Sequence, residues 1–446
     1  MTSHLFRRLR AMPARPAVGT VAMVLLLGSA FACNRLLDVQ APSRVPASTL
    51  DNPAQAQLIV NGAQADFECA FASYAVVSGM MDGELEDATL SAGRWDYDRR
   101  TVQSGDAYGP NTCNDGSFLG VYTPLSIARY SGDHAVADLQ GWTDDQVQNR
   151  HLLIATASAY AGYSLTLLGE GFCSAAIDVG PQLMPDQLLD SAAARFSLAI
   201  TEATAAGGSA TDILDLALVG RARTFLDLGN TAGALADAQQ VPADFEYDAT
   251  YSSVSARREN YVFQQINKSP FNTVGQQFRD VAYDGTPDPR VPVDFNAATR
   301  MFDNRFGQYV QMKYQSIDAP IPLATGTEAQ LIVAEASGGQ TAIDIINALH
   351  AAAGLPPYSN TDPDSIQAQI VYERTAAFFL DGHHLGDVNR LHLPLYPATG
   401  VAYPSDPGTP GTSAKGGFYG QTTRFPLPDK ERFNNPNIPS STQPGC

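Results

Sequence analysis

Closely spaced acidic side chains are the first feature of this sequence that could do chemistry. Asp82, Glu84, Glu86 and Asp87 lie within one short segment. Two carboxylates flanking a sugar could carry out glycoside hydrolysis, and clustered carboxylate oxygens could bind Ca²⁺. Because Gly, Asp, Ser and aromatic residues without helical periodicity follow, we interpret the acidic run as part of a solvated loop.

Adjacent histidines offer a second possibility. His383 and His384 lie between Asp381 and Asp387, but neighbouring positions on a helix point about 100° apart and seldom bind one ion. The sequence contains no His-Glu-x-x-His, Gly-x-Ser-x-Gly or phosphate-loop motif, and the glycines of segment 169–171 lack the spacing of a dinucleotide site. We therefore predict a protein that is not an enzyme and has no metal or cofactor.

Aromatic residues among charged ones indicate a binding site instead. A sugar presents apolar CH faces and hydroxyl edges, so its site needs flat rings beside carboxylates, amides or arginine. Segment 94–100 has this composition. The ligand-binding residues predicted in this region are Arg94, Trp95, Asp96, Tyr97 and Tyr108. The alternative for Trp95 is a structural role, with its indole packed between a loop and a helix.

A second aromatic region covers residues 251–306, which include Tyr283, Phe302 and Arg305. We expect most of its rings to anchor the loop and a minority to face a ligand. Tyr283 is the ligand-binding candidate from this region.

Helices must position most of these residues. Residues 53–81 are predicted as a helix or broken helix, opened by the start signal Asp51-Asn52-Pro53, and 146–168, rich in Ala and Leu, as a helix. Residues 189–240 are predicted as helical hairpins, because their apolar residues recur at three- and four-residue steps. Gly229 and Asn230 would end one helix, and Thr231 would cap the next. Alanine-rich pairs of this kind are typical of tetratricopeptide-type hairpins.

The helical pattern is interrupted and then resumes. Residues 243–320 predict irregular excursions with short strands, and the segment after Leu393 predicts coil. Thr327 begins a predicted capping box, whereas Asp362 and Pro363 give the cap and first residue of another helix. The predicted fold class is all-α, with tetratricopeptide-like helical hairpins, long irregular loop excursions and a few short strands.

These elements suggest one domain over 49–446, because helical segments flank the irregular part on both sides. The helical scaffold is expected at about 146–240 and 327–392. The loop-rich ligand face is expected at about 82–122 and 243–320.

The N-terminus predicts export. Residues 1–32 combine arginines with a short apolar run, as a secretory signal does. The run ends at Cys33 in a context that resembles a bacterial lipoprotein box, so Cys33 is the predicted lipidation site and 33–48 a tether. The alternative is ordinary signal cleavage beside a free Cys33.

Charge and cysteine content agree with an envelope protein. The 28 basic and 46 acidic residues give a formal charge of −18, which argues against nucleic acid as a partner. Cys69, Cys113, Cys173 and Cys446 can pair in three ways. We favour Cys69–Cys173, because both lie in apolar, helical surroundings.

Several short motifs occur in a characteristic order along the chain. In the C-terminal third they are 328–336, 346–350, 353–356, 372–374, 381–387 with Arg390, 425–428 and 435–437. Cys33 with 37–39, 163–169 and 313–322 precede them. In this order they resemble the SusD/RagB family of outer-membrane lipoproteins. Segment 375–377 carries no charged residue, which indicates a divergent branch of this family.

The resemblance implies a role without covalent chemistry. Family members capture oligosaccharides or peptides at the cell surface, as lipid-anchored lids over TonB-dependent (SusC-like) outer-membrane transporters. Their helical hairpins contact the transporter, and their loops hold the ligand. The motif residues would then be structural, forming ion pairs and caps: Glu328, Glu335, Glu373, Arg374, Asp381 and Arg390. The alternative function is a helical-repeat scaffold of the envelope that binds no small ligand.

Overall fold

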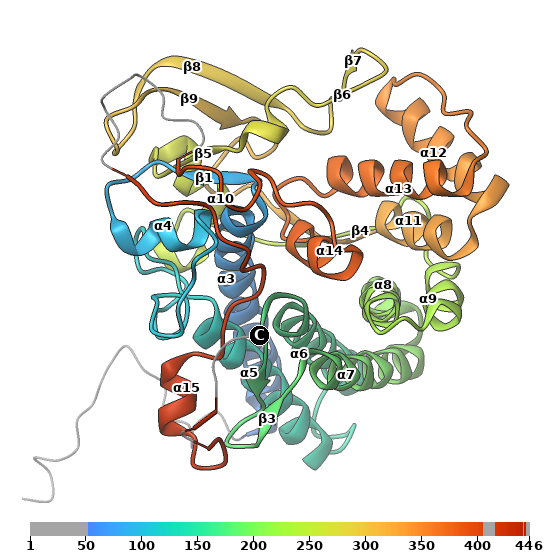
Figure 1. Ribbon diagram of the computed structural model, residues 1–446. Helices are drawn as coiled ribbons and strands as arrows, with labels where there is room; N and C mark the ends of the chain where they lie inside the picture. The colour runs from blue at the N-terminus through green and yellow to red at the C-terminus, as the bar shows by residue number, and fades with distance from the viewer. Residues whose placement is uncertain (1–51, 405–414, 440, 443–446) are drawn as a thin grey trace, which may run out of the picture. The chain divides into compact units, whose positions relative to one another are not determined.

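The computed structural model describes residues 52–404, 415–439 and 441–442. The predicted signal peptide, Cys33 and the tether lie outside these residues. The helices, shown in Figure 1, are η1 (Pro53–Gln55), α3 (Ala56–Asp82), α4 (Ala92–Asp98), α5 (Tyr122–Gly141), α6 (Arg150–Gly171), α7 (Pro185–Ala206), η2 (Gly207–Ala210), α8 (Thr211–Asp227), α9 (Thr231–Ala238), η3 (Ala256–Arg258), α10 (Tyr261–Phe263), η4 (Gln264–Lys268), η5 (Gln276–Phe278), α11 (Gly326–Ser337), α12 (Gly339–Ala353), α13 (Pro363–Ala377), α14 (His384–Leu391) and α15 (Asp429–Asn434).

The strands are short and form antiparallel pairs. They are β1 (Leu85–Asp87) with β5 (Asn272–Val274), β2 (Ala175–Ala176) with β3 (Gln182–Leu183), β4 (Glu246–Ala249) with β10 (Ile321–Thr325), β6 (Ala282–Tyr283) with β7 (Thr286–Pro287), and β8 (Val293–Arg300) with β9 (Phe306–Gln311). In β8–β9, Phe295 lies opposite Tyr309. The prediction of helical hairpins with irregular excursions and a few short strands is confirmed.

Helix α3 contacts both the stacked helices and parts of the loop-rich region. It packs against α4, α5, α6, α10, α14 and β1. From Phe67 to Asp82 every residue is buried, because neighbours cover all sides of the helix. Gly83 ends it in the left-handed conformation, at φ 86°, where glycine is favoured. The predicted helix over 53–81 is therefore confirmed.

The helices that follow stack in chain order. Helix α5 packs on α6, α6 on α7, α7 on α8, α8 on α9, and α9 on α11. Glycines allow close approach, because a Cβ on Gly162 or Gly220 would lie within 3 Å of the Phe196 ring. This packing of neighbours along the chain is the hairpin architecture that the alanine-rich pattern predicts.

Helix α6 is long and apolar enough to cross a membrane by length and composition alone, yet 94% of its apolar window is buried inside the protein. It contacts α5, α7, α8 and α14. Its apolar character is explained by this position in the core.

Two predicted helix caps are wrong by one or two residues. Asn230, not Thr231, caps α9 by accepting a hydrogen bond from the Gly233 backbone. Thr325, not Thr327, caps α11 by accepting from Glu328. In both, the capping oxygen must lie three residues before the amide that it satisfies. The cap at Asp362, with Pro363 following, is confirmed.

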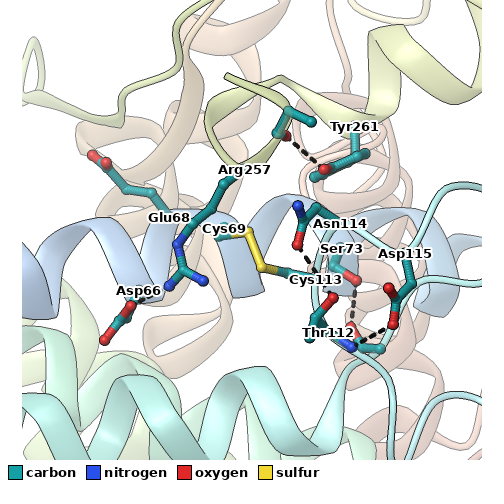
Figure 2. Close-up of a disulfide and its surroundings, with 12 residues drawn as sticks. Asp66, Glu68, Cys69, Ser73, Thr112, Cys113, Asn114, Asp115, Arg257 and Tyr261 are labelled. Carbon is teal, nitrogen blue, oxygen red and sulfur yellow. Dashed lines mark hydrogen bonds and ion pairs between the residues drawn. A yellow bond between two sulfur atoms is a disulfide. The ribbon is translucent and has the colours of Figure 1, made fainter. Parts of the chain in front are cut away.

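The cysteine pairing was also wrong. Cys69 on α3 forms a disulfide with Cys113, at a Cα–Cα distance of 5.7 Å and a sequence separation of 44, and not with Cys173 (Figure 2). The bridge ties the loop 101–121 to α3. Ser73, one helical turn further along α3, donates a hydrogen bond to the Gly120 carbonyl, 2.5 Å away. The loop is thus held at both ends of one helical turn.

Candidate functional site

Segment 94–100 lies mostly inside the protein. Residues 92–98 form helix α4, where the sequence predicted a loop. Arg94, Tyr97 and Tyr108 are buried. Tyr97 accepts a hydrogen bond from the Tyr108 amide (2.8 Å), and Tyr108 donates to the Pro426 carbonyl (2.7 Å). The prediction that these three residues contact the ligand is therefore wrong, because their side chains are not accessible to solvent.

Trp95 and Asp96 are the partly exposed members of the predicted cluster. The indole Nε1 of Trp95 donates to the Thr89 carbonyl at 3.0 Å. Asp96 pairs with Arg99 at 2.6 Å and accepts from Thr101. Both side chains therefore have structural partners, and both retain some accessible surface for a ligand.

The acidic run 82–87 is buried as well, so its interpretation as a solvated loop was wrong. Asp82 Oδ1 accepts from the Glu84 amide, and Glu84 Oε1 from the Leu380 amide. Burial raises the pKa of Asp82 to about 8, and burial with the nearby Asp82 raises that of Glu84. Asp82 therefore keeps its proton at neutral pH.

Asp87 is ionised, because it forms the centre of a buried ion cluster. Arg94 Nε lies 2.6 Å from Asp87 Oδ2, and Lys415 Nζ lies 3.2 Å from Oδ1. Burial raises the pKa of Asp87, but Arg94 and Lys415 outweigh it, so the net shift is downward. Lys415 also pairs with Asp303 (3.1 Å), which holds Arg305 (2.7 Å).

This ion cluster supports a depression of about 590 Å³ beside the β8–β9 hairpin. Its lining residues are Thr273, Gln276, Arg279, Asp280, Phe295, Met301, Arg305, Phe306, Gly307, Tyr309 and Tyr396. Four of them carry six-membered aromatic rings, and several others carry polar groups. It is the described depression whose composition best fits the requirements of a sugar site.

The aromatic floor of the depression is built from strand pairing. Phe295 and Tyr309 face each other across β8–β9, with ring centroids 4.7 Å apart. Gly307 has φ +88°, and a Cβ there would lie 2.6 Å from the Phe295 ring. Only glycine therefore permits this packing. Arg279 lies 4.1 Å over the opposite partner, Tyr309.

Three rings remain open to solvent at this site: Phe295 is 50% exposed, Phe306 54% and Tyr396 42%. The Tyr396 hydroxyl donates to Gln276 Oε1 at 3.0 Å, which fixes the ring at the rim. Exposed apolar faces beside carboxylate, amide and hydroxyl groups can stack on sugar rings and bond their hydroxyls. The arrangement can bind, and none of these groups forms a nucleophile–base pair.

Tyr283 lies elsewhere, beside the C-terminal helices. Its ring centroid is 4.4 Å from that of His350 and 5.8 Å from that of Tyr372. His350 contacts Glu373 at 2.7 Å, and Glu373 also pairs with Arg290 at 2.6 Å. Tyr283 is thus not brought together with Trp95 or with the depression, and its role as a ligand residue stays a prediction.

The other motif residues form a separate group at the start of α14. Arg374 pairs with Asp387 at 2.8 Å, and Arg390 pairs with Asp387 (3.2 Å), Asp227 (3.3 Å) and Glu335. Arg374 and Arg390 lower the pKa of Asp387 against the effect of its burial. These ion pairs join α8, α11, α13 and α14.

The histidine pair belongs to the same buried region. His383 contacts Asp381 (2.9 Å) and Glu328 (3.4 Å). Burial lowers the pKa of His383, but the two carboxylates outweigh it and hold the pKa at about 9, whereas burial lowers that of His384 to about 4. Within residues 52–404, 415–439 and 441–442, no group of His, Cys, Asp and Glu has a metal-binding arrangement.

The predicted aromatic region 251–306 includes Phe295 and Phe306 without singling them out, and sequence reasoning missed Tyr309 and Tyr396. One signal was available: Phe306, Tyr309 and Val310 are residue types that favour strands, and they lie within one six-residue segment. Tyr396 gave no signal, because it lies in a loop distant in sequence from the hairpin.

Comparison with known proteins places this architecture. No family model and no curated protein matches the sequence. Among solved structures, a SusD superfamily protein from Bacteroides vulgatus ATCC 8482 aligns with a TM-score of 0.61 and 14% identity, over 87% of this chain and 98% of its own. A SusD-like protein from Bacteroides fragilis NCTC 9343 gives 0.66 and 13%, over 88% and 98%.

A third solved structure, described as a putative sugar binding protein from Bacteroides vulgatus ATCC 8482, gives a TM-score of 0.64 and 14% identity, over 87% of this chain and 97% of its own. The chain therefore has the fold of the SusD superfamily. At 13–14% sequence identity, this structural similarity confirms the predicted resemblance to the SusD/RagB family at the level of the fold alone.

Proposed function

We propose that the protein is a lipid-anchored, surface-exposed nutrient-binding protein of the outer membrane that captures oligosaccharides or peptides. The observation that carries the proposal is the depression at the β8–β9 hairpin, where Phe295, Phe306 and Tyr396 expose their rings beside polar groups. A SusD-like fold supports this position, because the depression lies in the loop-rich region and not on the stacked helices.

Binding is tested by calorimetry with panels of oligosaccharides and peptides. Phe306→Ala should weaken binding about tenfold or more, the change expected when a ligand-facing ring is removed. Phe433→Ala is the matched control, because Phe433 is also exposed but lies on α15, outside the depression. Equal affinities for the two variants would place the ligand elsewhere, and release of cleaved products would contradict a pure binding function.

The protein is further proposed to act as the lid of a TonB-dependent transporter, held to the membrane through Cys33. The test is pull-down of the full-length, tethered protein from its own envelope, followed by mass spectrometry. A transporter barrel in near-stoichiometric amount is the expected result. Recovery of other envelope proteins without a barrel would favour the alternative, a helical scaffold whose stacked hairpins only organise proteins.

A further inference from the structure

The depression contains two arginines, and each already has a carboxylate partner inside the protein. Arg279 donates from Nε to the Val274 carbonyl (2.9 Å) and from Nη2 to Glu86 (3.2 Å), while its guanidinium lies over Tyr309. Its side chain is only 9% exposed. A ligand would therefore find the aliphatic and planar surface of Arg279 rather than an uncommitted cation.

Arg305 is still more enclosed. Its Nε lies 2.7 Å from Asp303 and its Nη2 donates to the Asp87 carbonyl at 3.0 Å, with Glu86 at 3.8 Å. The side chain is 1% exposed. Arg305 supports the depression from within and presents no charge at its surface.

Asp280 is the charged group that the depression presents to solvent. It is exposed, and it forms no ion pair or hydrogen bond within the part of the chain that the structure describes. A carboxylate accepts hydrogen bonds and cannot donate them. It therefore suits the hydroxyls of a sugar and repels a ligand carboxylate at short range.

We infer that this depression selects neutral oligosaccharides against acidic ones, and that Asp280 determines the selection. The inference rests on the proposed binding function and names its substrate class. Open rings supply stacking for any pyranose face, whereas among the described lining residues the two arginines are enclosed and the exposed charge is the carboxylate of Asp280. The chain's overall charge of −18 adds a weaker, salt-screened repulsion to the local one.

The experiment uses the full-length protein in detergent and matched pairs of probes. Maltohexaose, cellohexaose and mannohexaose are each compared with the derivative whose primary hydroxyls are oxidised to carboxylates. Titration calorimetry is done in 0.15 M salt on the wild type, Asp280→Asn and Asp190→Asn. Asp190 is an exposed acid on α7, outside the depression, so its variant makes the same change in net charge.

The expected result is that at least one neutral probe binds and that its oxidised partner binds roughly five- to tenfold more weakly, the size of one like charge at close range. Asp280→Asn should reduce the ratio of the neutral probe's affinity to that of its oxidised partner, and Asp190→Asn should leave this ratio unchanged. An oxidised probe that binds as well as its neutral partner, or an unchanged ratio in Asp280→Asn, would overturn the inference while keeping the binding function. Failure of every probe would reject the glycan-binding function itself.

Discussion

The stacked helices and the loop-rich region are stabilised by contacts of different range: the contacting residues are close in sequence in the first and far apart in sequence in the second. In the stack, each helix packs on its neighbour, and buried pairs such as Arg223–Glu170 join residues 53 apart. In the loop-rich region, Asp87 is bonded by Arg305 and Lys415, which are 218 and 328 residues away. Local apolar periodicity builds the first region, and long-range charge pairing builds the second.

This difference has a physical reason. A helix satisfies its own backbone and needs only one apolar stripe to dock. Short strands and irregular segments do not bury enough apolar surface by themselves, so specific polar contacts must fix their positions. The functional candidate lies in the second region, whose loops are positioned by the rigid stack and the ion cluster.

The largest expected effect comes from breaking the ion cluster. Asp87→Ala leaves Arg94 buried without its carboxylate and Lys415 paired with Asp303, and should lower the free energy of unfolding by about 3–5 kcal/mol. Asp133→Ala, whose pairs with Arg129 and Arg195 are partly exposed in the helical stack, should cost about 0–1 kcal/mol. Urea unfolding of both variants measures the difference, and equal losses would contradict the comparison.

The disulfide should come next. Replacing both Cys69 and Cys113 by serine removes a constraint on a 44-residue separation and should cost about 2–4 kcal/mol. Limited proteolysis should then cut within 101–121 first, because that loop loses its anchor on α3. If the protease cut first between the stacked helices, the disulfide would not be the main anchor of loop 101–121.

Close helix packing gives a smaller effect in the stack. Gly220→Val places a side chain where a Cβ alone lies 2.4 Å from the Phe196 ring, and should destabilise by about 1–3 kcal/mol. The control is Gly62→Ala on α3, where a Cβ meets nothing within 4 Å; it should stabilise by up to about 1 kcal/mol. Thermal unfolding of both variants measures the difference in stability. A Gly220→Val variant as stable as the wild type would argue against this tight contact.

Asp82→Asn should change the free energy of unfolding least of these variants at pH 4, and its effect should grow as the pH rises. The pKa of Asp82 is raised to about 8 by burial, so the folded protein keeps a proton that an unfolded chain loses near its ordinary value of 3.8. Stability from this group is present below pH 4 and is lost as the pH rises to about 8. Asn mimics the protonated carboxyl, so the variant should match wild type at pH 4 and exceed it at pH 8. Parallel pH profiles of unfolding would contradict this.

Much of the helical region could be predicted from the sequence. The stripe of apolar residues in 189–240, the cap at Asp362 and the helix over 53–81 all depend on residues within a few positions of one another. The interpretation of segment 94–100 failed because aromatic and charged residues have the same composition in a ligand site and in a buried, fully paired cluster.

The sequence by itself determined the helices of 53–81, 146–168 and 189–240, their order and the motif series that resembles SusD-like proteins, since periodicity and caps act over one or two turns. Only the tertiary structure decided that Cys69 meets Cys113, that the acids of 82–87 are buried, and that Phe295, Phe306 and Tyr396 share one depression. Each of these joins segments brought together by closing long loops, and composition does not encode which segments meet.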